Sequence, residues 1–345
     1  MFESAQTFLT TNEAARERPT VWIVVLNWNG HEDTRTCLAS LREVQYRPLR
    51  TLVVDNHSTV PGLDLLRSEF PDVDFVETDQ NIGFSAGNNL GISIAVKGGA
   101  DYVLLLNNDT IVDKEFLAPM VDVLGRNPNI GAACPTILQY CSAPTTLICY
   151  AGGRLRRLRG EGNRPGLGQE YSRRHQTSSR ETEFVTGCCL MLPVRMLERT
   201  GTLDEDFFFG VEDIEFSWRL QARGIQLAHI PGSVIWHKGG RSRGTSAVEV
   251  YRAYVSKVLL MRKVLSASAF FIWLTAYSGW MLICGWIPLT ARCNRDLRER
   301  YPARTLYRAV LEALLDGWRG RLDTRRVPAW LCSSVSKSAS LETKA

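Results

Sequence analysis

The sequence predicts an α/β fold with a doubly wound sheet, and three observations point to it. Residues 21–26 form a continuous apolar, β-branched run, which is typical of a strand buried on both faces of a parallel sheet. Strand-like and helix-like segments then alternate along the first third of the chain. Three of the strand-like segments end in polar clusters. Because ligands of open α/β sheets bind outside the carboxyl ends of the strands, these clusters predict where the site lies.

The alternating segments can be assigned one by one. After the first strand, the patterns predict a helix at 33–44, a strand at 51–54, a helix at 63–70, a strand at 73–76, a helix at 86–96 and a strand at 102–106. Order resumes near residue 184, with an apolar run at 188–192, a helix at 214–223 and a strand at 226–230. Residues 151–179 are rich in Gly, Arg, Ser and Gln without periodicity, which predicts a mobile loop.

The composition is that of a folded protein with anionic partners. The 345 residues are 45% hydrophobic and carry a net charge of +5, with arginines concentrated at 154–180 and beyond 292. This distribution favours anionic surfaces or diphosphates as partners over duplex nucleic acid. The nine cysteines form no metal-type CxxC pair and fall mainly in apolar segments, so we expect reduced thiols in the cytosol. The polar N-terminal residues lack the pattern of a signal peptide.

The C-terminal third contains a long uncharged segment. No charged residue lies between Lys263 and Arg292, and the segment contains Phe270, Phe271, Trp273, Trp280 and Trp286. About 20 apolar residues suffice to span a bilayer. The basic flanks, together with the glycines and the proline that interrupt the run, favour a re-entrant or in-plane helical pair over a crossing. A buried hairpin in a dimer interface is the alternative.

The three polar clusters hold candidate ligand-binding residues. We expect them to converge at one edge of the sheet, because each follows a parallel strand. The last cluster would suit a hard divalent cation that bridges a diphosphate, since one carboxylate often suffices when phosphate oxygens supply the other ligands. An ordinary turn is the alternative for the same triplet. The clusters are Asn27-Trp28-Asn29-Gly30, Asp55-Asn56-His57-Ser58 and Asn107-Asn108-Asp109.

Two further motifs carry candidate chemistry. Residues 81–91 place several glycines at a helix start, where backbone amides can face phosphate or ribose, although a purely structural helix start explains them equally well. Residues 203–213 gather five carboxylates around three aromatics before a helix, which suggests a pocket in which a sugar hydroxyl is deprotonated. Carboxylates at a helix N-terminus are also favourable through the helix dipole alone. His237 follows another strand-like segment, and a lone histidine is more often structural.

Taken together, these segments resemble the inverting family-two glycosyltransferases, in particular the rhamnosyltransferase-like bacterial members that build cell-envelope polysaccharides. The resemblance runs from about Thr20 to His237. No single motif is specific, but the ordered set is. The motifs are VVLNWNG, VVDNHST, NIGFSAGNNLGI, LLLNNDT, TGCCLML, LDEDFFFGVEDIEFSWR and IWHKGG.

The resemblance implies an architecture: a GT-A-type, Rossmann-like mixed sheet with a C-terminal membrane-associated helical region. The expected divisions are a flexible leader at 1–19, a catalytic domain at 20–245, the helical region at 246–330 and a flexible tail at 331–345.

The resemblance also assigns roles to residues. Asp213 matches the family's catalytic base. Asp109 would be the main ligand of Mg²⁺ or Mn²⁺, with His237 as a second ligand, and Asn107 stands where the family's DxD motif has its first carboxylate. The nucleotide-sugar would be bound by Asn27, Asn29, Asp55, Asn81, Gly83, Asn107, Asn108 and Asp109, and the acceptor side would be shaped by Glu212, Trp218 and Arg219.

The implied reaction is a single displacement that moves a sugar from a nucleotide-diphospho-sugar to a polysaccharide or polyprenyl-diphosphate-linked acceptor. Rhamnose from a thymidine-diphosphate donor is the first expectation, and another hexose, galactofuranose or mannose is the second. The arginines at 154–174 would contact a lipid-linked diphosphate or simply be solvated. We expect the protein to act at the cytoplasmic face of the cell membrane and to have no nucleic-acid partner. A homo-oligomer is possible. The competing readings are a catalytically weak carbohydrate-binding scaffold and an unrelated Rossmann-type oxidoreductase, against which the missing glycine fingerprint argues.

Overall fold

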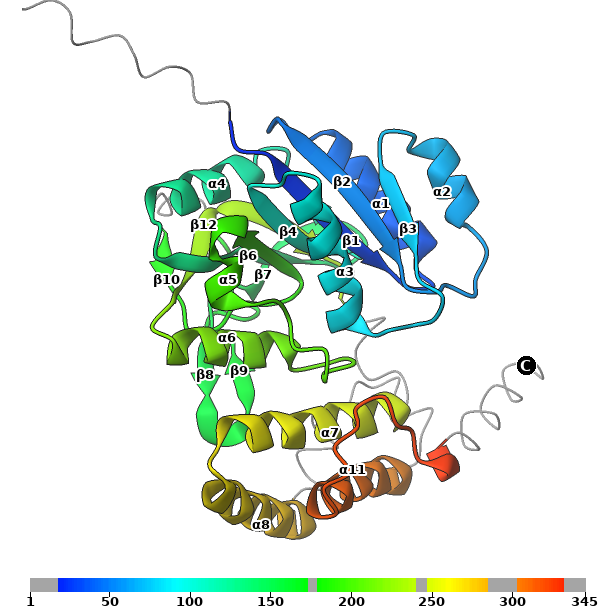
Figure 1. Cartoon of the computed structure of the whole chain (residues 1–345), viewed down its shortest axis with the longest axis vertical. Coiled ribbons are helices and arrows are strands. Elements are labelled where there is room, and N and C mark those ends of the chain that lie inside the picture. The colour runs from blue at the N-terminus through cyan, green and yellow to red at the C-terminus, as the bar shows by residue number, and fades with distance from the viewer. Residues whose placement is uncertain (1–17, 173–178, 240–246, 285–302, 332–345) are drawn as a thin grey trace, which may run out of the picture.

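The computed structural model describes residues 18–172, 179–239, 247–284 and 303–331 (Figure 1). Its centre is a 10-stranded mixed sheet in which the main strands follow the order β10-β12-β6-β11-β4-β1-β2-β3. The predicted parallel unit is confirmed, because β1 pairs in parallel with both β2 and β4, and β2 pairs in parallel with β3. These strands are β1 (Val21–Asn27), β2 (Leu49–Asp55), β3 (Asp74–Glu77) and β4 (Tyr102–Asn107).

The other half of the sheet makes it mixed. β11 (Cys189–Pro193) runs antiparallel to β4, and β12 (Gln226–His237) runs parallel to β6 (Ile130–Tyr140). Three short strands complete the sheet at its margins: β5 (Thr110–Val112) beside β12, β7 (Pro144–Tyr150) beside β6, and β10 (Arg180–Glu181) beside β12.

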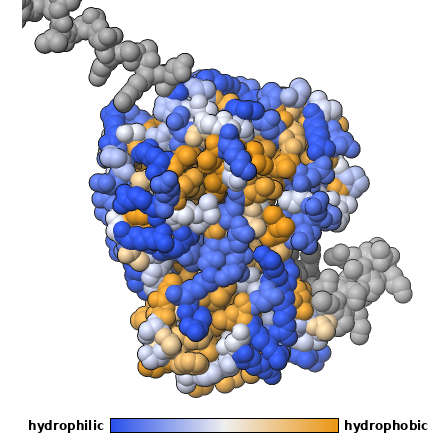
Figure 2. Space-filling view, in the orientation of Figure 1, coloured by the Kyte–Doolittle hydropathy of each residue, from blue (hydrophilic) through white to orange (hydrophobic). Residues whose placement is uncertain are grey.

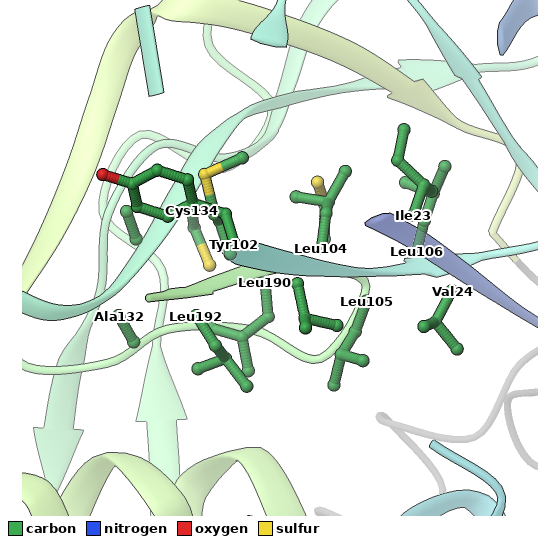
Figure 3. Close-up of a cluster of buried hydrophobic side chains, with 14 of the residues drawn as sticks. Ile23, Val24, Tyr102, Leu104, Leu105, Leu106, Ala132, Cys134, Leu190 and Leu192 are labelled. Atoms are coloured by element: carbon green, nitrogen blue, oxygen red, sulfur yellow. The ribbon is translucent and has the colours of Figure 1, made fainter. Parts of the chain in front are cut away.

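Helices cover both faces of the sheet, as expected for a doubly wound fold (Figure 1). Successive strand residues point to opposite faces and are buried on both; in Figure 3, Ile23 and Leu104 point to one side and Val24 and Leu105 to the other. The helices are α1 (His31–Arg42), α2 (Leu63–Glu69), α3 (Phe84–Lys97), α4 (Leu117–Arg126), α5 (Leu197–Thr200) and α6 (Glu212–Ala222).

Two glycines of α3 have a packing role. A Cβ on Gly87 would lie 2.6 Å from Leu26 Cδ1, and one on Gly91 would lie 2.2 Å from Val24 Cγ1. Helix α3 therefore sits closer to β1 than any side chain at these positions would allow. For this pair of glycines the structural explanation is the correct one.

The prediction of a structureless loop at 151–179 is wrong in part. β8 (Arg154–Arg156) and β9 (Glu161–Asn163) form an antiparallel hairpin closed by a 3₁₀ turn, η1 (Arg157–Arg159). Contacts from a distant segment hold its first strand, since the amide of Gly153 donates to Thr182 Oγ1 and the amide of Leu155 donates to Glu183 Oε2. Residues 173–178 of this segment lie outside the described residues.

The C-terminal third packs around a hydrophobic cluster of its own. Its helices are α7 (Ala247–Val264), α8 (Ala267–Cys284) and α11 (Ala303–Trp318). The buried carboxylate of Asp316 accepts hydrogen bonds from Tyr251 Oη at 2.6 Å and from Arg326 Nη1 at 2.9 Å, which joins α7, α11 and the chain after it. Across the ranges that the structure describes, no helix combines the length and apolarity needed to cross a membrane; residues 285–291 of the predicted uncharged segment are outside those ranges.

Candidate active site

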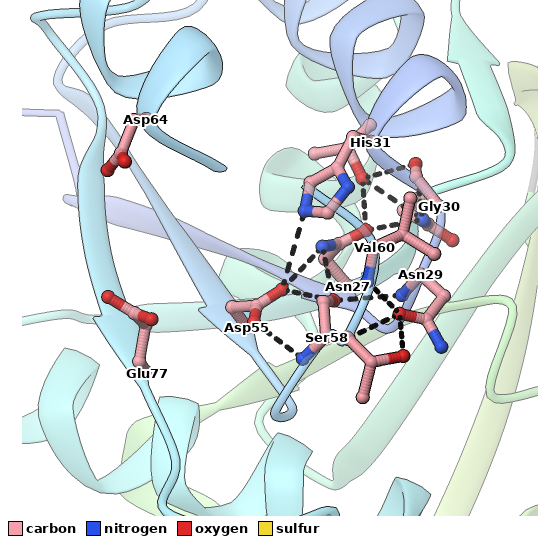
Figure 4. A network of polar contacts seen from close by, with 12 residues as sticks. Asn27, Asn29, Gly30, His31, Asp55, Ser58, Val60, Asp64 and Glu77 are labelled. Carbon is pink, nitrogen blue, oxygen red and sulfur yellow. Dashed lines mark hydrogen bonds and ion pairs between the residues drawn. The ribbon is translucent and has the colours of Figure 1, made fainter. Parts of the chain in front are cut away.

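The carboxyl ends of β1 and β2 are joined by a buried hydrogen-bond network (Figure 4). Asn27 is fully buried, and its Nδ2 donates to Asp55 Oδ1 at 2.6 Å and to Ser58 Oγ at 3.2 Å. Ser58 in turn donates from Oγ to Asp55 Oδ1 at 2.6 Å, and its amide donates to Asp55 Oδ2 at 2.9 Å. Asn29 closes the group by accepting the amides of Thr59 and Val60. The first two polar clusters thus converge, as their positions after parallel strands predicted.

The third polar cluster joins the first through Asn108. Its Nδ2 lies within hydrogen-bond distance of Asn27 Oδ1, of the carbonyl of Gly30 and of Thr34 Oγ1, at 3.0–3.2 Å. Thr34 also donates to Asn27 Oδ1 at 2.8 Å. The triplet after β4 is therefore a fixed part of the site.

Asn81 and Gly83 extend the site along the start of α3. Asn56 Nδ2 donates to Asn81 Oδ1 and to the carbonyl of Gly83, each at 3.1 Å. The amide of Gly83 donates to Asn81 Oδ1 at 2.9 Å. Gly83 has φ +91°, and a Cβ there would lie 2.6 Å from the carbonyl oxygen of Phe208, so only glycine fits.

Asp55 retains capacity for a ligand. A carboxylate offers about four acceptor positions, and the network uses three of them. His31 Nε2 lies 3.9 Å from Asp55 Oδ1, and neither ring nitrogen of this buried histidine makes a hydrogen bond to the described part of the protein. Asp55 therefore keeps one acceptor position that the described residues do not fill.

The non-glycine residues with positive φ in the described ranges all lie at this site. They are Asn29, His57 and Val211, with φ of 52°, 60° and 65°. Left-handed backbone is tolerated by asparagine and is rare for β-branched side chains, so Val211 is strained. Such strain collects where the surrounding structure must fix a functional loop. Val211 directly precedes Glu212 and Asp213.

Asp109 and His237 meet between β4 and β12. The antiparallel pairing of β5 with β12 sets His237 opposite Thr110, and His237 Nε2 lies 3.0 Å from Asp109 Oδ1 without hydrogen-bond geometry. Burial raises the pKa of Asp109, but the contacts with His237 and the charge of Lys238 outweigh it and hold that pKa below its ordinary value. Burial lowers the pKa of His237, but Cys188 and Asp109 beside it hold that pKa well above its usual range.

This pair fits a divalent cation. An octahedral ion with bonds of about 2.1 Å has neighbouring ligands about 3.0 Å apart, which is the separation of the Asp109 and His237 atoms. Within the described residues no three His, Cys, Asp or Glu side chains gather in a metal-binding group. The protein therefore offers two ligands, and a bound diphosphate would have to supply others, with Asn107 in place of a second carboxylate.

The carboxylate pair Glu212 and Asp213 begins α6. Asp213 is half-buried, and its Oδ2 accepts the amide of Gly187 at 3.2 Å. Burial raises the pKa of Asp213. Burial and the charge of Asp213 raise the pKa of Glu212 to about 8, and Glu212 Oε2 is buried without a hydrogen-bond partner among the described residues. Burial and the neighbouring charge therefore favour the protonated form of Glu212 near neutral pH.

The two halves of the site are joined through the backbone. The amide of Asn107 donates to the carbonyl of Cys188 at 2.9 Å, and Gly187, the preceding residue, holds Asp213. The strand end that leads to Asp109 and the segment that holds the carboxylate base are thus fixed to each other by one strand pairing.

The acceptor-side residues predicted on α6 do not all face this centre. Arg219 donates to Glu215 and to the carbonyls of Thr200 and Thr202, so it braces α6 against the preceding loop. Most of its donors are used within the protein, and its predicted role on the acceptor side stays a prediction. Trp218 lies beneath the guanidinium of Arg157, 5.0 Å from the ring centroid, and thus borders the β8–β9 hairpin.

Sequence reasoning did not single out several residues of the site. His31 and Thr34 lie in the first turn of α1. Their position as polar residues directly after a strand and a turn is the sequence signal that could have identified them. No local signal marks Gly187, which reaches Asp213 only through the tertiary fold. The site residues that were not predicted are His31, Thr34 and Gly187.

The fold and site define a mixed α/β protein with a polar centre at the carboxyl ends of its strands, beside the carboxylate pair of Glu212 and Asp213. The family model described as "Glycosyltransferase like family 2" matches residues 19–255. The chain therefore belongs to the family-two glycosyltransferases.

Characterised relatives align over most of their length. The low-salt glycan biosynthesis hexosyltransferase Agl10 of Haloferax volcanii is 26% identical over 285 residues, which is 81% of this chain and 87% of that protein. The N-acetylglucosaminyl-diphospho-decaprenol L-rhamnosyltransferase of Mycobacterium tuberculosis is 25% identical over 236 residues, which cover 64% of this chain and 77% of that protein.

Solved structures share the fold. GalNAc-T7 with UDP, GalNAc and Mn²⁺ superposes with a TM-score of 0.55 at 16% identity, over 64% of this chain and 43% of that one. The mannosyltransferase PcManGT of Pyrobaculum calidifontis, in complex with GDP-Man and Mn²⁺, superposes with a TM-score of 0.50 at 16% identity. The superposition covers 89% of this chain and 88% of that one. At these identities the likeness establishes a GT-A-like fold and nothing finer.

Proposed function

We propose that the protein is an inverting, divalent-metal-dependent glycosyltransferase that moves rhamnose from dTDP-rhamnose to a glycan or polyprenyl-diphosphate-linked acceptor in cell-envelope polysaccharide synthesis. The observation that carries the transferase proposal is the position of Asp213. Its carboxyl group is half-buried and is linked through Gly187 and Cys188 to the strand end that bears Asp109. A base on one side and a diphosphate site on the other are the requirements of a direct displacement.

The chemistry divides among a few side chains. The nucleotide would lie along Asn27, Asp55, Asn81 and Gly83, with the free acceptor position of Asp55 toward the base. Asp213 takes the proton of the acceptor hydroxyl as that oxygen bonds to the anomeric carbon. The bond to the diphosphate breaks on the opposite face, and its electron pair leaves with the nucleoside diphosphate, so the anomeric configuration inverts.

A metal ion at Asp109 and His237 would neutralise charge on the departing diphosphate, which is Lewis-acid catalysis. Asn108 and Lys238 support this position, Asn108 through its bonds to Gly30 and Thr34 and Lys238 through its pairing with Asp33 at 2.9 Å. His237 also contacts Asp109 directly, so the two ligands hold each other in place before any donor binds.

The choice of rhamnose rests on the Mycobacterium tuberculosis relative, whose name gives an L-rhamnosyltransferase acting on a diphospho-decaprenol acceptor. A different hexose is the second candidate, because the Haloferax volcanii relative is named only as a hexosyltransferase. A scaffold that binds the nucleotide-sugar without turnover is a third, since Asn107 replaces a carboxylate. We further propose that the enzyme works at the cytoplasmic face of the cell membrane.

The test is release of nucleoside diphosphate by the purified protein with Mn²⁺ or Mg²⁺ and a polyprenyl-diphosphate glycan acceptor. Thymidine-, uridine- and guanosine-diphospho-sugars are compared, beside Asp213→Asn. The matched control is Asp64→Asn, because the Asp64 side chain is 99% exposed on α2. We expect acceptor-dependent turnover with dTDP-rhamnose, lost in Asp213→Asn and kept in Asp64→Asn. Turnover with another donor would identify that donor's sugar as the one transferred, in place of rhamnose. Donor binding without any turnover would support the scaffold proposal.

A further inference from the structure

Helix α8 leaves an apolar face open. It has no charged residue, and its inner face packs through Phe270, Leu274 and Met281. Its outer face carries Ile272 and Ile283, which are 72% and 84% exposed, with further exposed apolar neighbours at 271, 280 and 282. Figure 2 shows hydrophobic residues gathered over the part of the molecule where α8 and α11 lie. A contiguous exposed apolar patch of this kind marks a binding surface.

The tip of the β8–β9 hairpin lies beside this face. Leu158, at the tip, is 85% exposed, and its carbonyl accepts a hydrogen bond from Trp273 Nε1 of α8 at 2.8 Å. Lys257 of α7 pairs with Glu161 of β9 at 2.6 Å and holds the other side of the tip. The hairpin and α8 therefore form one surface, although they are more than 100 residues apart in the chain.

The surface combines aromatic and basic groups. On α8, Trp273 stacks on Tyr277 with ring centroids 4.8 Å apart. Trp280 and Trp318 are each nearly half exposed, and Trp318 Nε1 bonds to Ser278 Oγ. Tryptophan and tyrosine with an apolar body and a polar edge are enriched where membranes meet water. Around Leu158 the hairpin adds exposed arginines at 154, 156 and 159.

We propose that the outer face of α8, Trp318 and the tip of the β8–β9 hairpin form one docking surface for a bilayer that contains anionic lipids. The apolar face would enter the interfacial layer in the plane of the membrane, as amphipathic helices do. The hairpin arginines would lie at the level of the phosphates, where each adds electrostatic attraction. A second copy of the chain fits less well, because a symmetric contact would bring the same arginines toward one another.

The surface also orients the proposed active site, and this step rests on the proposed function. Arg157, next to Leu158, stacks over Trp218 and donates to Gln221 Oε1 at 2.6 Å. Both partners lie on α6, the helix whose first turn carries Asp213. The hairpin thus connects the helix of the base with the helix at the membrane (Figure 1). A docked enzyme would take an acceptor whose lipid tail stays in the same bilayer.

The test is flotation of the full-length protein with vesicles of phosphatidylcholine, alone or with phosphatidylglycerol. We expect binding to the anionic vesicles that weakens with salt. Ile272→Glu with Ile283→Glu should abolish it, and Arg156→Glu with Arg159→Glu should weaken it about tenfold or more and remove the preference for phosphatidylglycerol. Leu65→Glu, which alters an apolar residue 61% exposed on α2, is the matched control and should bind as the wild type does.

Two outcomes would overturn the proposal. One is wild-type protein that fails to float with the anionic vesicles. The other concerns the variant that carries Ile272→Glu and Ile283→Glu. If this variant still binds vesicles, but light scattering shows a monomer where the wild type is a dimer, the face would be assigned to a second copy of the chain. Binding of dTDP, measured through the quenching of tryptophan fluorescence, distinguishes this proposal from the enzymatic one. The surface variants should keep it, and its absence in the wild type would count against the donor site alone.

Discussion

The side-chain oxygen of Thr324 accepts a hydrogen bond from the amide of Phe208 at 2.9 Å, although the two residues are separated by 116 positions. The same hydroxyl donates to the carbonyl of Asp206 at 2.6 Å, and Thr324 is 1% exposed. The carbonyl of Phe208 accepts the amide of Phe84, at the start of α3 beside Gly83. The C-terminal segment thus holds the loop that leads to Asp213 against the donor half of the site.

Thr324→Val should uncouple this loop at nearly constant volume. It leaves two buried backbone groups without partners, which costs about 1–3 kcal/mol. We expect a melting temperature lower by several degrees and a kcat for sugar transfer reduced more than the KM for the donor is raised. Thr324→Ser keeps the hydroxyl and should restore kcat. Equal losses in the Ser and Val variants would mean that the methyl group matters and the hydrogen bonds do not.

Asp213 and Glu212 should respond differently to neutralisation. Asp213→Asn removes the base and should lower kcat about 10²–10⁴-fold. Glu212→Gln mimics the proton that Glu212 already carries, because burial and Asp213 raise its pKa to about 8. It should therefore keep most of the activity at neutral pH. Steady-state rates of the two variants decide this, and the reverse order of losses would make Glu212 the base.

The same pKa predicts how stability changes with pH. The folded protein holds the Glu212 proton up to about pH 8, whereas a glutamate in the unfolded chain loses its proton near pH 4.5. Between these values the folded state binds more protons, so the contribution of Glu212 to stability falls as pH rises and levels off above about pH 8. We expect the melting temperature of the wild type to fall relative to Glu212→Gln from about pH 5 to about pH 8. Glu198→Gln, at an exposed site, should show no such trend.

Metal binding should depend on both members of the Asp109 and His237 pair. Asp109→Asn and His237→Ala should each weaken Mn²⁺ binding in the presence of nucleoside diphosphate, about 10-fold or more, as measured by the paramagnetic signal of free Mn²⁺. Asp113→Asn, a carboxylate beyond β5, is the control and should bind Mn²⁺ normally. Chelation should remove turnover and leave the melting temperature in the absence of donor unchanged. Unaltered Mn²⁺ binding in both variants would mean that the metal site lies elsewhere in the protein.

Gly83 offers a test of the donor site that does not alter charge. Gly83→Ala and Gly99→Ala place a Cβ at similar backbone angles, φ +91° and +80°, but only the first meets other atoms, with Phe208 O at 2.6 Å. Both variants should lose stability, by about 1–3 kcal/mol, because alanine rarely adopts a positive φ. Only Gly83→Ala should also weaken donor binding, measured by calorimetry with dTDP. Equal donor affinity in the two variants would exclude Gly83 from the nucleotide contact.

The sequence predicted the parts of the fold that depend on local pattern. The apolar strands β1, β2 and β4 and the helices α1, α2 and α3 were placed within a few residues, and the polar ends of the strands converge as expected. The mixed half of the sheet was less accessible, because β6 and β7 depend on pairing with distant strands. The β8–β9 hairpin was missed because residues 182 and 183 hold it. The partners of Arg219, the carbonyls of Thr200 and Thr202, could not be predicted, because they carry no sequence signal.

The antiparallel pairing of β11 with β4 has a consequence for evolution within this scaffold. Asn107 and Cys188 are in fixed register, with Asp109 two residues beyond one and Asp213 hydrogen-bonded to the neighbour of the other. The span between leaving group and base is therefore a property of the main chain. Loops that select the sugar or the acceptor can be exchanged around that span without retuning it, whereas a single inserted residue in either strand would misalign the displacement for every substrate at once.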